Sequence, residues 1–250
     1  MQPHPAGAAP LPSPGAVAAA STPPRPLDVD RPSILTRAGT SLWRLAIAFF
    51  GLYAVYLTVS DNGVDSLYNL SQLSALIAGV YFGVLAIYAW IPRRRVDEPS
   101  PVLRLWVVVL TSITCAVYFV RMSGDVSGFE SLSVHLIVPL MVIVDWCLFG
   151  RNQEDMASWH PFVGLVAPLA YLGVALWRGS DTGTPLYYFL DPGRSDFFMF
   201  LGVMIIAVVL FGYLLLALGL LHRVARTGVG RGKRASAYDP EYDARYDKHR

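Results

Sequence analysis

The side chains of this chain that can do chemistry are few, and the two clearest lie inside one apolar segment. His135 and Asp145 are ten residues apart in a stretch that otherwise carries no charged residue. An ionisable side chain at membrane depth costs about 3 kcal/mol or more, so each is a candidate for function. Ten helical residues span roughly 15 Å, which excludes a catalytic pair formed by these two side chains.

Further polar residues are expected at the depth of His135. Tyr68, Ser71 and Gln72 share one helical face at the start of an earlier apolar segment, which begins on the same side of the membrane as the segment of His135. Other polar residues end or precede neighbouring segments at this level. Together they predict a pocket near the outer surface, lined by His135, Tyr68, Asn69, Ser71, Gln72, Arg121, Arg178, Tyr187 and Asp191.

The composition places these residues in a membrane protein. Of 250 residues, 54% are hydrophobic and 15% are charged, whereas soluble domains carry about 25% charged residues. Too few charges remain to cover a soluble surface, so a soluble globular enzyme and a nucleic-acid-binding protein are both excluded. We therefore expect membrane lipids as the partners of this chain.

Six apolar segments are long enough to cross a bilayer, which takes roughly 20 helical residues. Backbone groups in lipid must be paired within their own segment, so the prediction is an all-α, polytopic bundle of six transmembrane helices. The transmembrane domain is expected over 42–221, after a disordered Pro- and Ala-rich tail over 1–41 and before a charged tail over 222–250. The six segments cover about 42–60, 67–91, 104–121, 132–150, 159–177 and 197–221.

Basic residues set the expected orientation. The two ends of the chain and alternate connections hold 17 of the 20 Lys and Arg residues, with Arg44 and Arg104 among them. The opposite connections hold only Arg121, Arg178 and Arg194. Positive residues stay on the cytoplasmic side, so both termini are expected in the cytoplasm and the protein in the cell (plasma or inner) membrane.

Several polar or small residues also have a structural interpretation. Asp145 and His160 are expected to be structural, with Asp145 bonded to Ser158, Trp159 or His160. Ala75, Gly79 and Gly83 form a small-residue stripe for close helix packing. The chain has no CxxC or HExxH spacing, so neither a metal nor another cofactor is expected. Cys115 and Cys147 differ in depth by roughly 15 Å, which is too far for a disulfide.

The segment from His135 to Asp191 resembles a six-helix integral membrane protein family of the androgen-induced, FAR-17a type, in its bacterial branch. The bacterial pattern runs from an H-x-x-x-P motif to D-W, then to P-L-A-Y-L, R-G and a Tyr-rich F-L-D. The matching positions here are His135, Pro139, Asp145, Trp146, Pro168, Leu169, Ala170, Tyr171, Leu172, Arg178, Gly179, Tyr187, Phe189, Leu190 and Asp191.

The resemblance implies hydrolysis of acyl lipid esters by a membrane threonine nucleophile and a histidine base. The histidine corresponds to His135, but Tyr68 stands where the family has its threonine. Ser71, Tyr68 or Thr58 is then the candidate nucleophile, with Asn69, Gln72 or Arg121 near the oxyanion. Two other readings stay open: a non-catalytic protein that binds a lipid or partner, and a transporter, for which Pro139 and Pro168 would interrupt helices.

The predicted orientation can be tested with a reporter fused after Arg250. A phosphatase that is active only outside the cytoplasm should be inactive at this position, and a fluorescent protein that folds only in the cytoplasm should be bright. An active phosphatase at the C-terminus would contradict the orientation.

Overall fold

The computed structural model describes residues 33–91, 100–122, 124–149 and 152–236. Within these ranges the regular structure is entirely helical. Six spans there are long and apolar enough to cross a membrane, which confirms the predicted all-α, six-helix architecture. Most of the N-terminal tail that is expected to be disordered, residues 1–32, lies outside the described residues. So do the last charged residues, 237–250.

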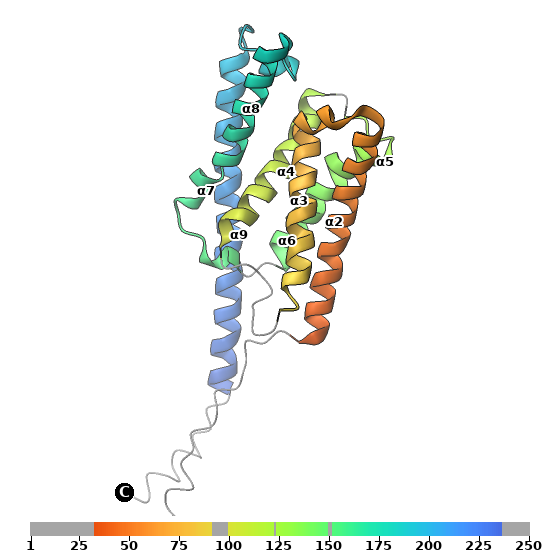
Figure 1. Ribbon diagram of the computed structural model, residues 1–250. Coiled ribbons are helices and arrows are strands. Elements are labelled where there is room, and N and C mark those ends of the chain that lie inside the picture. Colours follow the sequence, from red (N-terminus) through yellow and green to blue (C-terminus); the bar gives the residue numbers. More distant parts are fainter. Residues whose placement is uncertain (1–32, 92–99, 123, 150–151, 237–250) are drawn as a thin grey trace, which may run out of the picture. The chain divides into compact units, whose positions relative to one another are not determined.

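The first three spans are continuous helices, and the next two are interrupted (Figure 1). The continuous ones are α2 (Ile34–Asn62), α3 (Leu70–Tyr88) and α4 (Pro101–Arg121). The fourth span joins α5 (Phe129–Leu132), a π-helical turn η2 (Ser133–Ile137) and α6 (Val138–Leu148). The fifth joins α7 (His160–Val163) and α8 (Val166–Thr182), and the sixth is the first part of α9 (Phe197–Ser236).

Three short 3₁₀ turns lie in the connections: η1 (Val64–Tyr68), η3 (Asn152–Asp155) and η4 (Tyr188–Leu190). We call the end of the bundle that carries connections 62–70, 121–129 and 182–197 the distal end, and the opposite end the terminal end. The start of α2 and the end of α9 lie toward the terminal end, because six spans separate them.

The first helix begins at Ile34, earlier than the expected residue 42, and so takes up part of the predicted N-terminal tail. Ser33 caps it, since its side chain accepts a hydrogen bond from the Thr36 amide. Its first turns are fixed to α3, because Arg37 and Ser41 donate hydrogen bonds to carbonyl groups near the end of that helix. The last helix likewise continues past residue 221, to Ser236.

Small residues allow α2 and α3 to approach closely. A Cβ atom on Gly51 would lie 2.8 Å from the carbonyl oxygen of Ala75, and one on Gly79 would lie 2.7 Å from Leu52. Contacts of this kind need residues without bulky side chains at the crossing point. The predicted packing role of Ala75 and Gly79 is therefore confirmed, whereas a Cβ on Gly83 would meet Ala48 at an ordinary 3.6 Å.

Proline explains both interruptions. Pro139 has no amide hydrogen, and its ring conflicts with the carbonyl four residues earlier, which belongs to His135. A π-helical turn just before Pro139 avoids this conflict, and in it the Val138 amide donates a hydrogen bond to the Ser133 carbonyl. Pro168 acts in the same way on Gly164, and there the helix breaks between α7 and α8.

The main core lies between α2, α3, α4, α6 and α9. Its members are large apolar side chains that are almost fully buried, and Trp146 is the largest. A second, smaller core joins Ala54 and Val55 of α2 to Ala75 of α3 and Val134 of η2. This core brings the distal parts of the second and fourth spans together.

Adding a methyl group should change the stability in opposite directions at two glycines of α2, because only one of them lies at the close crossing with α3. Gly51→Ala should destabilise the protein by about 1–3 kcal/mol, because the new Cβ meets backbone. Gly39→Ala meets nothing within 4 Å and should stabilise by about 0.5–1 kcal/mol. Thermal unfolding in detergent, followed by circular dichroism, checks both, and equal shifts would contradict the packing.

Candidate functional site

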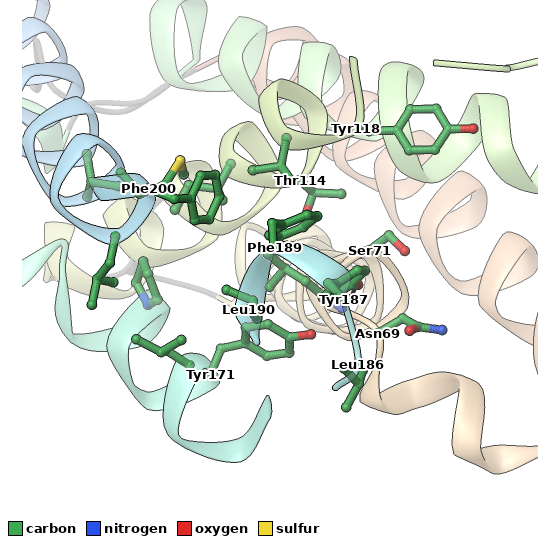
Figure 2. Close-up of a pocket in the computed structure, with 18 of the residues that line it drawn as sticks. Asn69, Ser71, Thr114, Tyr118, Tyr171, Leu186, Tyr187, Phe189, Leu190 and Phe200 are labelled. Carbon is green, nitrogen blue, oxygen red and sulfur yellow. Dashed lines mark hydrogen bonds between the residues drawn. The ribbon is translucent and has the colours of Figure 1, made fainter. Parts of the chain in front are cut away.

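A cavity of about 360 Å³ lies at the distal end, between the first turn of α3 and helices α4, α8 and α9. Figure 2 shows that Ser71, Asn69 and Tyr118 lie toward one end of the drawn group, while Phe200 lies toward the other. The wall is mostly apolar, and helices α8 and α9 supply much of it. Its polar members are Asn69, Ser71, Thr114, Tyr118, His135, Tyr171 and Tyr187.

Four of the residues predicted for the pocket meet in this cavity. Asn69 and Ser71 come from the start of α3, His135 from η2, and Tyr187 from the connection between α8 and α9. The structure therefore brings together side chains that are far apart in the sequence. The other predicted residues do not line the cavity, and their positions are described below.

His135 stacks on Tyr118 of α4. The two ring centres are 3.5 Å apart and the planes are nearly parallel, at 8°. Nδ1 of His135 lies 3.0 Å from the carbonyl oxygen of Ser131. A carbonyl only accepts, so Nδ1 carries the hydrogen of the neutral ring and Nε2 carries a lone pair. Within the described residues, Nε2 makes no hydrogen bond.

The ring of His135 is held by a small network that the sequence reasoning missed. The Tyr118 hydroxyl donates to the Asp125 carbonyl and lies 3.0 Å from the Ser131 hydroxyl. The Ser131 hydroxyl in turn donates to the same carbonyl at 2.7 Å. Ser131 precedes His135 by four residues, so its spacing is the one sequence signal that points to this contact.

Hydroxyl groups of the cavity wall also hold the surrounding helices together. The Leu70 amide, first in α3, donates to the Tyr187 hydroxyl at 3.0 Å, and the Tyr171 hydroxyl donates to the Tyr68 carbonyl at 2.9 Å. Burial raises the pKa of Tyr187, so its phenol is neutral at ordinary pH. Thr114 lies 3.0 Å from Ser74 of α3. Within the described residues, the Ser71 hydroxyl has no hydrogen-bond partner.

Arg121 lies behind the cavity wall. Its Nη2 is 3.5 Å from Oδ2 of Asp196, and its guanidinium is 5.2 Å from the ring centre of Phe200. Asp196 also accepts from Arg194 at 2.9 Å, and these hydrogen bonds lower the pKa of Asp196. The arginine predicted to stabilise an oxyanion is therefore engaged in an ion pair and does not line the cavity.

Arg178 and Tyr68 form a separate contact at the distal surface. The guanidinium of Arg178 lies 4.6 Å from the ring centre of Tyr68 and 3.3 Å from the carboxylate of Asp65. Asp181 is a further partner of the guanidinium, at 3.7 Å. The structure does not bring the Tyr68 hydroxyl, a candidate nucleophile, to the cavity wall.

The remaining candidates have local roles. Gln72 is buried outside the cavity wall, and Asp191 accepts a hydrogen bond from the Gly193 amide in a turn. The Thr58 hydroxyl donates to the Ala54 carbonyl of its own helix. His160 accepts from the Ala157 amide at 3.0 Å, which fits its predicted structural role.

A buried ion cluster near the terminal end corrects the expected partners of Asp145. The side chains of Arg44, Arg104 and Asp145 are all 0% exposed. Asp145 pairs with Nε of Arg44 at 3.3 Å and with Nη2 of Arg104, and its carbonyl accepts from Arg104 at 2.7 Å. The expected contacts of Asp145 with Ser158, Trp159 or His160 are replaced by these ion pairs.

The cluster also corrects the interpretation of two basic residues. Arg44 and Arg104 were counted among the residues that flank the membrane, but both are buried between helices. Arg104 reaches Asn152 of η3 at 3.3 Å as well. A single carboxylate on α6 thus binds arginines from α2 and α4, which joins three helices.

Among the described residues, no group of three or more His, Cys, Asp or Glu side chains is placed to hold a metal ion. Cys115 and Cys147 are not joined to each other. The polar side chains that line the cavity carry hydroxyl, amide and imidazole groups.

The ion cluster predicts a large loss of stability for Asp145→Asn. The variant keeps the shape but removes the negative charge that Arg44 and Arg104 share, and breaking buried ion pairs in this way costs about 3–5 kcal/mol. Asp181→Asn is the matched control, since Asp181 is 58% exposed in its pair with Arg178 and should change stability by less than about 1 kcal/mol. Thermal unfolding of both variants is the measurement, and similar small shifts would contradict the role of the cluster.

No family model, curated protein or solved structure matches the chain. The family resemblance of the segment from His135 to Asp191 therefore stays a prediction.

Proposed function

We propose that this membrane protein binds the acyl chain of a lipid in the distal cavity. The observation that carries the proposal is the cavity itself. Its volume of about 360 Å³ falls within the range of roughly 300–1,000 Å³ that is typical of ligand sites. Its wall is largely apolar with a few polar groups, which is the chemistry that an amphiphile requires.

The apolar part of the wall is suited to a hydrocarbon tail. Leucine side chains at the start of α8 and within it line one part of the cavity, and apolar side chains of α9 line another. These residues are Leu165, Leu169, Leu172, Leu201, Met204 and Ile205. Because the cavity lies within the span of the helices, an acyl chain in the surrounding lipid is already at the right depth.

Hydrolysis of an acyl ester is the second candidate function, and the orientation of His135 favours it. With Nδ1 bonded to the Ser131 carbonyl, Nε2 is the basic nitrogen. Ser71 lines the same cavity, and its hydroxyl makes no hydrogen bond within the described residues, so it is the candidate nucleophile. Its oxygen would attack the ester carbonyl while its proton passes to Nε2, and that proton would then leave with the alcohol.

A second half-reaction would complete the cycle, in which water attacks the acyl-serine and Ser71 regains its proton through His135. In the structure no hydrogen bond joins Ser71 to His135. Hydrolysis therefore requires the two side chains to meet when a substrate is bound, whereas acyl binding needs no such movement.

We also propose that the distal end faces the outside of the cell. The basic residues support this orientation even without Arg44 and Arg104, since the terminal connections and tails still hold most of the remaining Lys and Arg.

Two neighbouring isoleucines of α9 allow a matched test of acyl binding. Ile205 lines the cavity, while Ile206 does not and is 61% exposed on the surface. Ile205→Trp should fill the cavity and lower the occupancy by a medium-chain fatty acid or its monoacylglycerol by about tenfold or more. Ile206→Trp should match the wild type in native mass spectrometry of the purified protein. Equal occupancy in both variants would contradict binding at this site.

Ester hydrolysis can be tested separately with a medium-chain nitrophenyl ester. If His135 is the base, His135→Ala should lower kcat by about 100-fold or more, and Ser71→Ala should do the same if it is the nucleophile. His222→Ala, on α9 outside the cavity, serves as the histidine control. Absence of turnover above the His135→Ala background would reject the hydrolase and leave acyl binding.

A further inference from the structure

We infer that the cavity selects an uncharged acyl lipid whose head group carries both a carbonyl and a hydroxyl. This inference rests on the proposed function, because it names the class of lipid that the acyl-binding cavity takes. It follows from two properties of the cavity wall. One is the charge of its side chains, and the other is which of its polar groups already make hydrogen bonds.

No Lys, Arg, Asp or Glu is present in the described wall of the cavity. A carboxylate or phosphate brought from water into such a site has no counter-charge, and burying an unpaired ion costs far more than burying a neutral polar group. To gain a counter-charge from His135, a carboxylate would have to add a second proton to the partly buried ring at Nε2, because the hydrogen on Nδ1 is already bonded to the Ser131 carbonyl.

The arginines nearest to the cavity are already paired. Arg121 reaches the cavity only through the rings of Phe189 and Phe200, and it is bonded to Asp196. Arg178 is bonded to Asp65 and Asp181 at the surface. Neither guanidinium lines the cavity, so a lipid anion held there gains no direct contact with a cation.

Three polar groups of the wall make no side-chain hydrogen bond within the described residues: the amide of Asn69, the hydroxyl of Ser71 and Nε2 of His135. Asn69 and Ser71 offer donors, and both stand at the N-terminus of α3, whose partial positive charge favours an acceptor oxygen. An ester or amide carbonyl supplies that oxygen without a full charge.

Nε2 of His135 needs the opposite partner. It carries a lone pair in the tautomer set by Ser131, so it accepts a hydrogen bond and a ligand hydroxyl supplies one. The Tyr187 hydroxyl accepts from the Leu70 amide and leaves its hydrogen as a further donor for the ligand carbonyl, whereas the other hydroxyl groups of the wall, apart from that of Ser71, already donate within the protein. Tyr118 and Tyr171 donate to backbone carbonyls, and the Thr114 hydroxyl donates within α4.

Three amides with the same lauroyl chain separate these requirements. N-lauroyl ethanolamine has the carbonyl and a hydroxyl, N-ethyl lauramide lacks only the hydroxyl, and N-lauroyl glycine replaces the alcohol carbon with a carboxylate. Amides resist ester hydrolysis, so binding is measured even if the protein is a hydrolase. Each is titrated against the full-length protein in phosphatidylcholine nanodiscs at pH 7.5, and occupancy is read by native mass spectrometry.

The ethanolamide should bind about tenfold more tightly than the ethylamide, which leaves the histidine acceptor unpaired. It should bind about 100-fold more tightly than the acyl glycine, which carries the buried charge. Equal or tighter binding of the acyl glycine would overturn the inference, and so would equal binding of the two neutral amides. Failure of all three ligands to bind would instead overturn the proposed function.

His135→Leu gives an internal check, because it removes the acceptor but keeps an apolar wall. The preference for the ethanolamide over the ethylamide should fall to about onefold, because neither ligand then meets or misses the Nε2 acceptor. A preference that survives in this variant would overturn the assignment of His135 to the ligand hydroxyl. If the variant does not fold, the comparison of the three ligands on the wild type still decides the inference.

Discussion

The structure depends on the requirement that polar groups inside a membrane find their partners within the protein. Asp145 meets it by binding Arg44 and Arg104, with all three side chains fully buried. Because the three residues belong to α2, α4 and α6, the cluster fixes three helices at one height and in one rotation. The apolar core around Trp146 and Phe82 fills the space beside this cluster.

At the distal end the same requirement is met only in part, because some polar groups of the cavity wall make no hydrogen bond within the described residues. Pro139 imposes the π-helical turn that carries His135, and Pro168 interrupts the fifth span at Gly164. Tyr118 and Ser131 fix the histidine ring, which lines the cavity, and its second nitrogen makes no hydrogen bond within the described residues. The buried charges of the terminal end are thus paired within the protein, whereas the distal end keeps polar groups that the proposed lipid would pair.

The sequence was sufficient to predict the fold class, since six apolar segments of the right length admit little else. It also placed Asn69, Ser71, His135 and Tyr187 near one another, because helix direction sets depth. It did not identify the partners of Asp145, because basic residues at span ends are usually assigned to the membrane surface and helix rotation is set by packing. The ion pairs of Arg121 and Arg178 were not predicted for the same reason. Their partners Asp196 and Asp65 are far away in the sequence and lie beside them only in the folded chain.

The central claim is that the distal cavity holds an acyl lipid, and mapping a photoreactive probe on the wild-type protein tests it most directly. Cells or nanodiscs would be labelled with a diazirine-bearing monoacylglycerol, irradiated, and the modified residues identified by mass spectrometry. We predict modification of wall residues such as Tyr171 and Met204, and competition by the unlabelled lipid. Modification confined to lipid-facing residues such as Met199 and Tyr213, without competition, would contradict the claim.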